Sequence, residues 1–165
     1  MSGFCFLVMR TLWANDRGAS LIELIMVMAI LGVLAVVLLP RLNPQDFDAR
    51  GFHDETLALL RYAQKTAVAQ RRQVCVAFTA GSATLSQAAA EGNVPCTAPL
   101  PGPRGEVPGR VTARSGVSYQ TVPGSDLVFD ALGRPNAGLT LQVLAGATPL
   151  GRTITVEADT GYVHD

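Results

Sequence analysis

Residues 17 to 40 read RGASLIELIMVMAILGVLAVVLLP, and the rest of the chain has to be understood in relation to this stretch. No charged residue interrupts it between Leu24 and Leu39. At about 1.5 Å of rise per residue, a helix from Leu21 to Leu39 is roughly 28 Å long, close to the ~30 Å hydrocarbon thickness of a bilayer. The pattern therefore predicts one membrane-spanning helix near the N-terminus.

Sequence on both sides of this helix predicts its fate and its orientation. No small-x-small cleavage site follows at Pro40 to Asn43, so we expect the helix to remain in the mature protein. Arg10 and Arg17 precede it, which predicts a cytoplasmic N-terminus and places the residues after Pro40 outside. Glu23 lies near the cytoplasmic end, where an ionisable group is costly to insert and usually has a partner. The alternative is a carboxylate that simply reaches the interface.

The sequence from Arg17 to Leu24, followed by an apolar helix, resembles the class III signal of type IV pilins and type II secretion pseudopilins. The resemblance implies that a prepilin peptidase cuts between Gly18 and Ala19 and methylates the new N-terminus. Ala19 then takes the position where the family usually has Phe, and Glu23 becomes the fifth mature residue. Pro40 falls where such pilins commonly have a helix-bending proline.

The resemblance also divides the chain. Pilin leaders are short and polar, whereas residues 3–8 are apolar, so Met9 is favoured over Met1 as the start, with a longer leader as the alternative. The implied parts are a leader over residues 1–18, the transmembrane half of a spine helix over 19–40, and a periplasmic or extracellular head over 41–165.

A second helix is predicted after a break at Asn43 to Asp46, where Pro44 disfavours helix at the residue before it. From Phe52 to Arg72 apolar and charged residues alternate at helical spacing, which predicts an amphipathic helix. The resemblance implies that it continues the membrane helix. We interpret the charged side of this helix as a solvated face. The alternative is that its basic residues contact DNA or another filament subunit. The apolar face holds Phe52, Leu59, Ala63 and Ala67, and the opposite face Asp54, Arg61, Lys65 and Arg72.

Beyond Gln73 the spacing of apolar residues is that of strands. Val74–Thr79 and Thr84–Ser86 predict a hairpin around Ala80–Ser82. The segment from Ala88 to Arg114 is rich in Ala, Pro and Gly, so it is predicted to be a long surface loop without a central strand. The predicted fold is α+β, a long N-terminal helix with a transmembrane first half and an antiparallel β-sheet head domain. Further strands are predicted at 116–122, 127–129, 139–144, 153–157 and 162–163.

Two later segments extend the resemblance. Phe129 to Pro135, FDALGRP, resembles a turn found in H-type minor pseudopilins and their minor-pilin relatives, and Thr153 to Val163 resembles their closing hairpin. In such a turn Asp130 can bond nearby backbone and Gly133 can adopt positive φ. Together with Phe47 to Arg72, these segments are most similar to minor pilins of mannose-sensitive haemagglutinin pili.

Cleavage after Gly18 would remove Cys5 and leave Cys75 and Cys96 as an even pair on the oxidising side of the membrane. We therefore expect a disulfide between them, with two free thiols as the alternative. The bond would close a loop of about 22 residues and stabilise the fold by roughly 3 kcal/mol.

The sequence offers no pattern for catalysis or for a cofactor. It contains no GxSxG, HExxH or glycine-rich phosphate loop. His53 and His164 lack the neighbours of a zinc site. Asp126 and Asp130 could ligate Ca²⁺ from a loop, but without an EF-hand pattern we expect no metal.

A structural filament subunit is the leading hypothesis, either a type IV pilus component or a type II secretion pseudopilin. The implied partners are the prepilin peptidase, other pilin or pseudopilin subunits through their N-terminal helices, and inner membrane lipid before assembly. The amino group of mature Ala19 in one subunit could neutralise Glu23 of its neighbour. The expected location is the bacterial inner membrane, with the head in the periplasm and assembly into a surface pilus.

A DNA-binding minor pilin used in natural transformation is the alternative from another class. Arg104, Arg110 and Arg114 lie in the predicted loop, where they could contact phosphates. Against it, the 13 basic residues of the chain are balanced by 13 acidic ones, so no overall positive field attracts DNA.

We predict processing between Gly18 and Ala19. Intact-mass measurement of the membrane-extracted protein should give a chain that begins at Ala19, and Gly18→Val should leave the precursor uncut because the peptidase requires the small residue. A mature N-terminus at any other residue would contradict this assignment.

Overall fold

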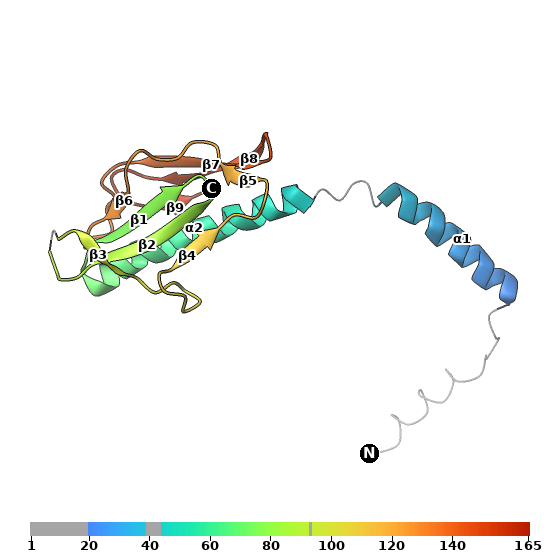
Figure 1. The fold of residues 1–165 in the computed structure, drawn as a ribbon, viewed down its shortest axis with the longest axis horizontal. Coiled ribbons are helices and arrows are strands. Elements are labelled where there is room, and N and C mark those ends of the chain that lie inside the picture. Colours follow the sequence, from blue (N-terminus) through green and yellow to red (C-terminus); the bar gives the residue numbers. More distant parts are fainter. Residues whose placement is uncertain (1–19, 39–43, 93) are drawn as a thin grey trace, which may run out of the picture. The chain divides into compact units, whose positions relative to one another are not determined.

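The computed structural model describes residues 20–38, 44–92 and 94–165, and the chain divides into two units, Met1–Leu42 and Asn43–Asp165. In the first unit, α1 covers Leu21–Leu38 (Figure 1). Its large side chains from Leu21 to Leu34 are exposed on all sides of the helix. A search of the described residues finds no helix that combines the length and apolar character needed to cross a membrane. Gly18, Ala19 and Pro40 lie outside the described residues.

The second unit begins with α2, Pro44–Gln70. A break was predicted at Asn43 to Asp46, but α2 already begins at Pro44, so the prediction is wrong for Pro44 to Asp46. Proline is well suited to the first helical position, because no N–H is needed there. The helix ends where Arg71 adopts a left-handed φ of 51°. The amide of Arg72 donates to the carbonyl of Ala67 at 3.2 Å, which satisfies one of the last carbonyls of the helix.

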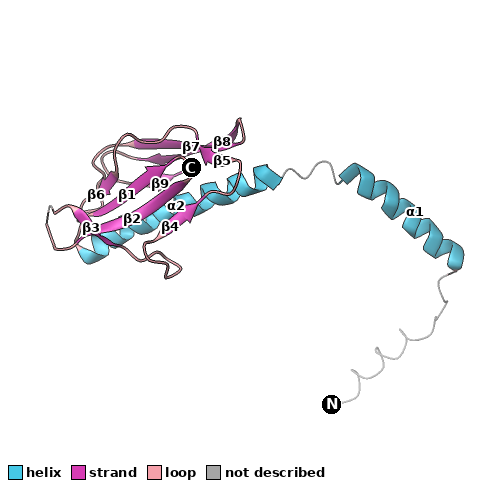
Figure 2. Cartoon of the chain, in the orientation of Figure 1, coloured by secondary structure: helices cyan, strands magenta, loops and turns pink. Residues whose placement is uncertain are grey.

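Two antiparallel sheets complete the head (Figure 2). The first has the order β3-β2-β1-β6, and β4 also pairs with β2. The second has the order β5-β7-β8-β9. The strands of the first sheet are β1 Val74–Thr79, β2 Ser82–Ala88, β3 Cys96–Pro99, β4 Arg110–Thr112 and β6 Leu127–Phe129. Those of the second are β5 Val117–Tyr119, β7 Leu139–Ala145, β8 Thr148–Val156 and β9 Val163–His164.

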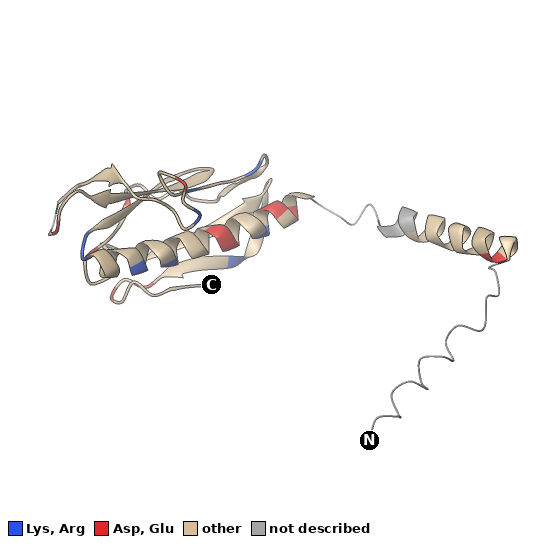
Figure 3. Ribbon diagram, turned by 90° about the horizontal axis from the view of Figure 1, so that it is seen from below, with Lys and Arg blue, Asp and Glu red and all other residues tan. Residues whose placement is uncertain are grey.

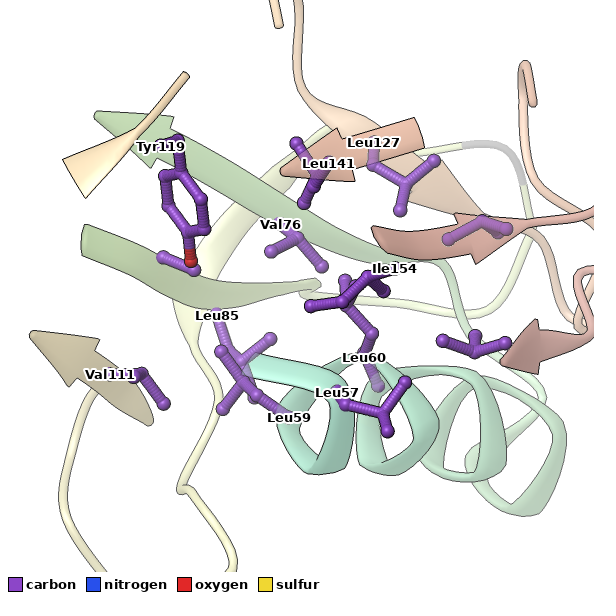
Figure 4. Close-up of a cluster of buried hydrophobic side chains, with 14 of the residues drawn as sticks. Leu57, Leu59, Leu60, Val76, Leu85, Val111, Tyr119, Leu127, Leu141 and Ile154 are labelled. Atoms are coloured by element: carbon purple, nitrogen blue, oxygen red, sulfur yellow. The ribbon is translucent and has the colours of Figure 1, made fainter. Parts of the chain in front are cut away.

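The core lies between α2 and both sheets (Figure 4). Leu59 and Leu60 of α2 are at most 1% exposed, and they share one cluster with residues of both sheets, such as Leu85 and Ile154. A fully buried leucine contributes roughly 1.5–3 kcal/mol, so this shared face is the main source of stability. The predicted apolar face of the helix is confirmed, because Phe52, Leu59, Ala63 and Ala67 are all buried.

Tyr119 of β5 brings a polar group into this core. Its ring lies 4.8 Å from that of Phe52, centroid to centroid, and its hydroxyl is 2.8 Å from Thr56 Oγ1. Burial raises the pKa of Tyr119, against the opposing effect of the hydrogen bond with Thr56. The phenol therefore stays neutral, and its hydroxyl is satisfied inside the core.

The α+β class and the antiparallel head are confirmed, but one predicted loop is wrong in part. The segment from Ala88 to Arg114 contains β3 and β4, and both pair with β2. Proline is compatible with this because the two strands share β2 at the side of the sheet away from β1, and β3 ends at Pro99.

One contact ties the two sheets to the end of α2. Gln64 Nε2 donates to the carbonyl oxygens of Gly133, at 3.3 Å, and Thr160, at 3.1 Å. The first lies in the turn after β6 and the second in the turn between β8 and β9. Gly161 has a φ of 69°, and a Cβ there would overlap the carbonyl oxygen of Gly133. Only glycine fits at this position.

Gly161→Ala should therefore lower the free energy of unfolding by at least about 2 kcal/mol, because the new methyl group needs both a strained φ and space that Gly133 occupies. Urea unfolding of the detergent-solubilised full chain measures it. Gly124→Ala is the matched control, since its Cβ would meet open space. Equal stability of the two variants would show that the turns are not packed as described.

Candidate functional site

The N-terminal end of α1 carries the only charged side chain of that helix. The backbone carbonyl of Ser20 accepts hydrogen bonds from the amides of Glu23, at 2.9 Å, and Leu24, at 3.1 Å. Ser20 is therefore the N-cap residue, and Glu23 occupies the third helical position. Ser-x-x-Glu is the spacing of a capping box, and a carboxylate there also interacts favourably with the helix dipole. Sequence reasoning missed the capping role of Ser20 and Glu23, although the Ser-x-x-Glu spacing can be read directly from the sequence.

This geometry gives Glu23 two separate uses. Within one chain, the carboxylate can support the first turn of α1. Between chains, it is a charge on a helix whose other described side chains are apolar, and burial of such a charge requires a partner of opposite sign. A glutamine could serve the first use but not the second.

Cys75 and Cys96 form a disulfide with a Cα–Cα distance of 6.1 Å. Cys75 lies in β1 and Cys96 in β3, and β2 lies between these strands in the sheet. The bond therefore joins the two neighbours of β2. It also closes a loop between two residues 21 positions apart in the sequence, which restricts the unfolded chain.

The three arginines considered for DNA contact lie on or beside β4, but they face partners from the same chain. Arg104 pairs with Glu55 at 3.5 Å, and Arg114 pairs with Asp48 at 3.1 Å. Arg110 donates to the hydroxyl of Ser82 at 3.2 Å. Two small hollows, of about 140 and 130 Å³, run along this side, and each is lined by both acidic and basic side chains. The surface has mixed charge, and two of the arginines hold their segment against α2.

The turn after β6 is held by Asp130. Its Oδ1 accepts from the amides of Leu132, at 2.9 Å, and Arg134, at 2.8 Å, and its Oδ2 accepts from Arg134 Nε at 3.2 Å. Desolvation acts to raise the pKa of Asp130, but these hydrogen bonds and the guanidinium outweigh it and lower the pKa. The sequence-based expectations for this turn are confirmed, because Gly133 has a φ of 79°.

No metal site is evident in the part of the chain that the structure describes, since no three His, Cys, Asp or Glu side chains are grouped to hold an ion. Both oxygens of Asp130 are engaged by protein donors. His53 is fully buried beside Asp54, with Nδ1 3.1 Å from the carboxylate, and His164 lies 3.0 Å from Glu157.

Comparisons with known protein families match two parts of this chain. Residues 13–39 match the prokaryotic N-terminal methylation motif, which contains Gly18, Ala19 and Glu23. Residues 54–160, well over half of the chain, match the family described as type II transport protein GspH. The chain belongs to the GspH family. Membership confirms the predicted pilin or pseudopilin class.

Solved structures of two bacterial proteins are similar to this chain. The type IV minor pilin FimU of Pseudomonas aeruginosa is similar with a TM-score of 0.51 and 17% identity, over 70% of this chain and 86% of that one. The minor pseudopilin EpsH of the Vibrio cholerae type 2 secretion system is similar with a TM-score of 0.49 and 12% identity, over 71% of this chain and 94% of that one. No curated protein sequence matches this GspH-family chain significantly.

We predict that Asp130→Ala lowers the free energy of unfolding at pH 7 by roughly 1–2 kcal/mol, because two amides lose their acceptor. A lowered folded-state pKa stabilises the fold above the unfolded value of about 3.9, and this contribution disappears as the pH falls through the folded pKa. The difference between wild type and mutant should therefore shrink in acid.

Denaturant unfolding at several pH values measures this. Asp126→Ala is the control, because among the described residues Asp126 accepts a hydrogen bond through its backbone carbonyl, from Asn136 Nδ2 at 3.1 Å, and its carboxylate makes none. A difference between wild type and Asp130→Ala that does not change with pH would refute the role of the carboxylate.

Proposed function

We propose that this chain is a minor pilin, a structural or initiating subunit of a type IV pilus. It is made as a precursor, is inserted into the inner membrane through residues 19–40, and is cut and methylated at Ala19. Its head then lies in the periplasm until the subunit enters a filament. The subunit has no catalytic role. The single observation that carries the proposal is Glu23, one carboxylate at the start of an otherwise apolar helix, directly after the processing motif.

The exposed side chains of α1 explain how such a subunit is held. From Leu21 to Leu34 the large aliphatic side chains are exposed, so this helix needs an apolar environment to cover them. Lipid supplies it before assembly, and the helices of neighbouring subunits supply it afterwards. The change requires little energy, because tightly packed helices and lipid tails are about equally apolar.

Glu23 makes that transfer selective. An unpaired carboxylate near the centre of a bilayer costs about 2.5–3.5 kcal/mol, and less near the interface. A helix bundle is more favourable only if it provides a cation, and the amine of mature Ala19 on the adjacent subunit lies at the same end of an equivalent helix. The charge pair therefore aligns neighbouring subunits along their axes.

The filament system is the finer part of the proposal. Phe47 to Arg72 and the FDALGRP turn favour a pilus of the mannose-sensitive haemagglutinin type. A minor pseudopilin of a type II secretion system is the second candidate, and the GspH family name and its match over residues 54–160 favour it. Identification of the neighbouring genes as a pilus cluster or a secretion cluster distinguishes the two.

We predict that Glu23→Gln enters filaments at least about tenfold less than wild type, because glutamine can still cap α1 but cannot neutralise an amine. Glu23→Val should be equally poor and Glu23→Asp intermediate. Each variant should still insert and be cleaved, since none makes the helix more polar than wild type. The measurement is the ratio of the subunit in sheared filaments to that in membranes.

Intact mass at Ala19 is the control for processing in every variant. If Glu23→Gln matches wild type while Glu23→Val fails, the carboxylate acts only as a helix cap. If all variants match wild type, Glu23 has no part in assembly.

A further inference from the structure

Phe47 is the most exposed of the large apolar side chains in the described head. It is 79% exposed, and it lies in the first turn of α2, which begins at Pro44. The neighbouring aromatic residue on this helix, Phe52, is only 4% exposed and belongs to the core. Phe47 therefore takes no part in the core, and its ring is available to a partner from outside the head.

The segments around the start of α2 form a well-defined surface, which we call the base of the head. The side chain of Gln45 lies against two glycines, since an added Cβ would be 2.9 Å from it at Gly116 and 3.4 Å from it at Gly146. The amide of Gly146, in the turn between β7 and β8, donates to the carbonyl of Gly116 at 2.6 Å. Three distant parts of the chain thus meet beside Phe47. Because this surface is already ordered, little conformational freedom is lost when a partner covers the ring.

Most acidic side chains near this base are neutralised within the head. Figure 3 shows acidic positions near the beginning of α2. The three acidic residues that follow Phe47 in the first half of α2 are each paired with an arginine from outside the helix. Asp46 and Arg50 remain, both exposed and without an ion-pair partner among the described residues. The base is therefore close to neutral. The pairs are Asp48–Arg114 at 3.1 Å, Asp54–Arg152 at 3.4 Å and Glu55–Arg104 at 3.5 Å.

The length of the connecting chain keeps this base close to the membrane. In the proposed function residues 19–40 lie in the bilayer, and the uncharged run ends at Leu39. Five residue steps separate Leu39 from Pro44, and even a fully extended chain covers only about 18 Å in that distance. The headgroups occupy roughly the first 5–8 Å outside the hydrocarbon. Phe47, in the first turn of α2, is therefore within reach of the headgroups.

We propose that Phe47 inserts into the headgroup region of the membrane before assembly and so orients the head. An aromatic ring at this depth covers its apolar surface at the boundary of the acyl chains. Arg50, three residues later on the helix, is then near the lipid phosphates, to which a guanidinium can donate hydrogen bonds. This role rests on the proposed function, because it requires residues 19–40 to be in the bilayer. It belongs to the unassembled subunit, since the ring must leave the lipid when the subunit enters a filament.

The exposed apolar side chains at the other end of α2 are less suited to this contact. Val68, 21 residues after Phe47, is roughly 32 Å further along the helix. Leu132 lies in the turn beside Val68, because Gly133 of the same turn is in contact with the Val68 side chain. Leu132 is 72% exposed, so it resembles Phe47 in exposure but not in its distance from the membrane segment. It provides the matched control.

Tryptophan fluorescence of the full-length chain in vesicles tests the insertion. The chain has one tryptophan, Trp13, so Trp13→Phe makes each introduced tryptophan the only one. The vesicles consist of phosphatidylethanolamine and phosphatidylglycerol, with or without bromine on the acyl chains near the headgroup, which quenches tryptophan on contact. Phe47→Trp should lose at least about half of its fluorescence in the brominated vesicles. Leu132→Trp should keep most of its fluorescence.

A second reporter tests whether Phe47 holds the base at the membrane. Ala147 is exposed in the turn that contains Gly146, so Ala147→Trp reports on the same base. Its quenching by brominated lipid should fall about threefold when Phe47→Ser is added, because serine cannot anchor the base. Phe47→Leu should retain most of the quenching, because leucine keeps an apolar side chain.

Several results would overturn this role of Phe47. They are no quenching of Phe47→Trp, equal quenching of Leu132→Trp, and quenching of Ala147→Trp that Phe47→Ser leaves unchanged. Fluorescence of Phe47→Trp that varies with the ratio of protein to lipid, but not with bromine, would show that a second copy covers the ring and would also overturn it. Extraction with alkaline carbonate separates this role from the proposed function. A chain that stays in the vesicles without quenching contradicts the anchoring role alone, whereas a chain that carbonate releases contradicts both.

Discussion

The buried face of α2 is shared by both sheets of the head. Each sheet is small, and several strands are only two to four residues long. Such short strands are marginal unless one face of the sheet is covered. Leu59 and Leu60 supply that cover together with Phe52 and Ala63, and the sheets meet around the same helix (Figure 4). Any change that rotates or breaks α2 would therefore expose both sheets at once.

α1 stands in contrast to this helix. α2 is amphipathic and packs its apolar face against the two sheets of the head, whereas α1 is apolar on every side and its large side chains from Leu21 to Leu34 are exposed. In the proposed function the two helices have different roles, because α2 organises the head and α1 supplies a surface for lipid or for the helices of other subunits. Glu23 is the one charge on this apolar helix, so in the proposed function it sets how neighbouring helices align along their axes.

Helices and strands were predicted well where the spacing of apolar residues along the chain determines them. Leu127–Phe129 was predicted with its observed ends, and the buried face of α2 followed from helical spacing. β3 and β4 were missed because Pro99 and the other prolines of the segment between them argue against strands, and because their pairing with β2 cannot be read from local spacing. The start of α2 was placed too late, because Pro44 was read as a breaker when it is also a favoured first residue. The acidic partners of Arg104 and Arg114 lie in α2, far away in the sequence, so no spacing rule could have found them.

The edges of the first sheet limit how heads can meet. Beside β6, Asn136 takes the place of a neighbouring strand. Its side-chain Oδ1 accepts from the backbone amide of Val128 at 3.0 Å, and its backbone amide donates to the carbonyl of Val128 at 2.9 Å. On the far side, β3 ends at Pro99, and β4 is only three residues long and is held towards α2 by flanking arginines. Short, covered or proline-bearing edges resist strand addition. Heads of this kind are therefore poorly suited to association by sheet extension, and exposed side chains such as those of α1 are the better surface for contacts between subunits. Contacts of that kind can be rearranged as a filament grows, because they leave the hydrogen bonds of each head intact.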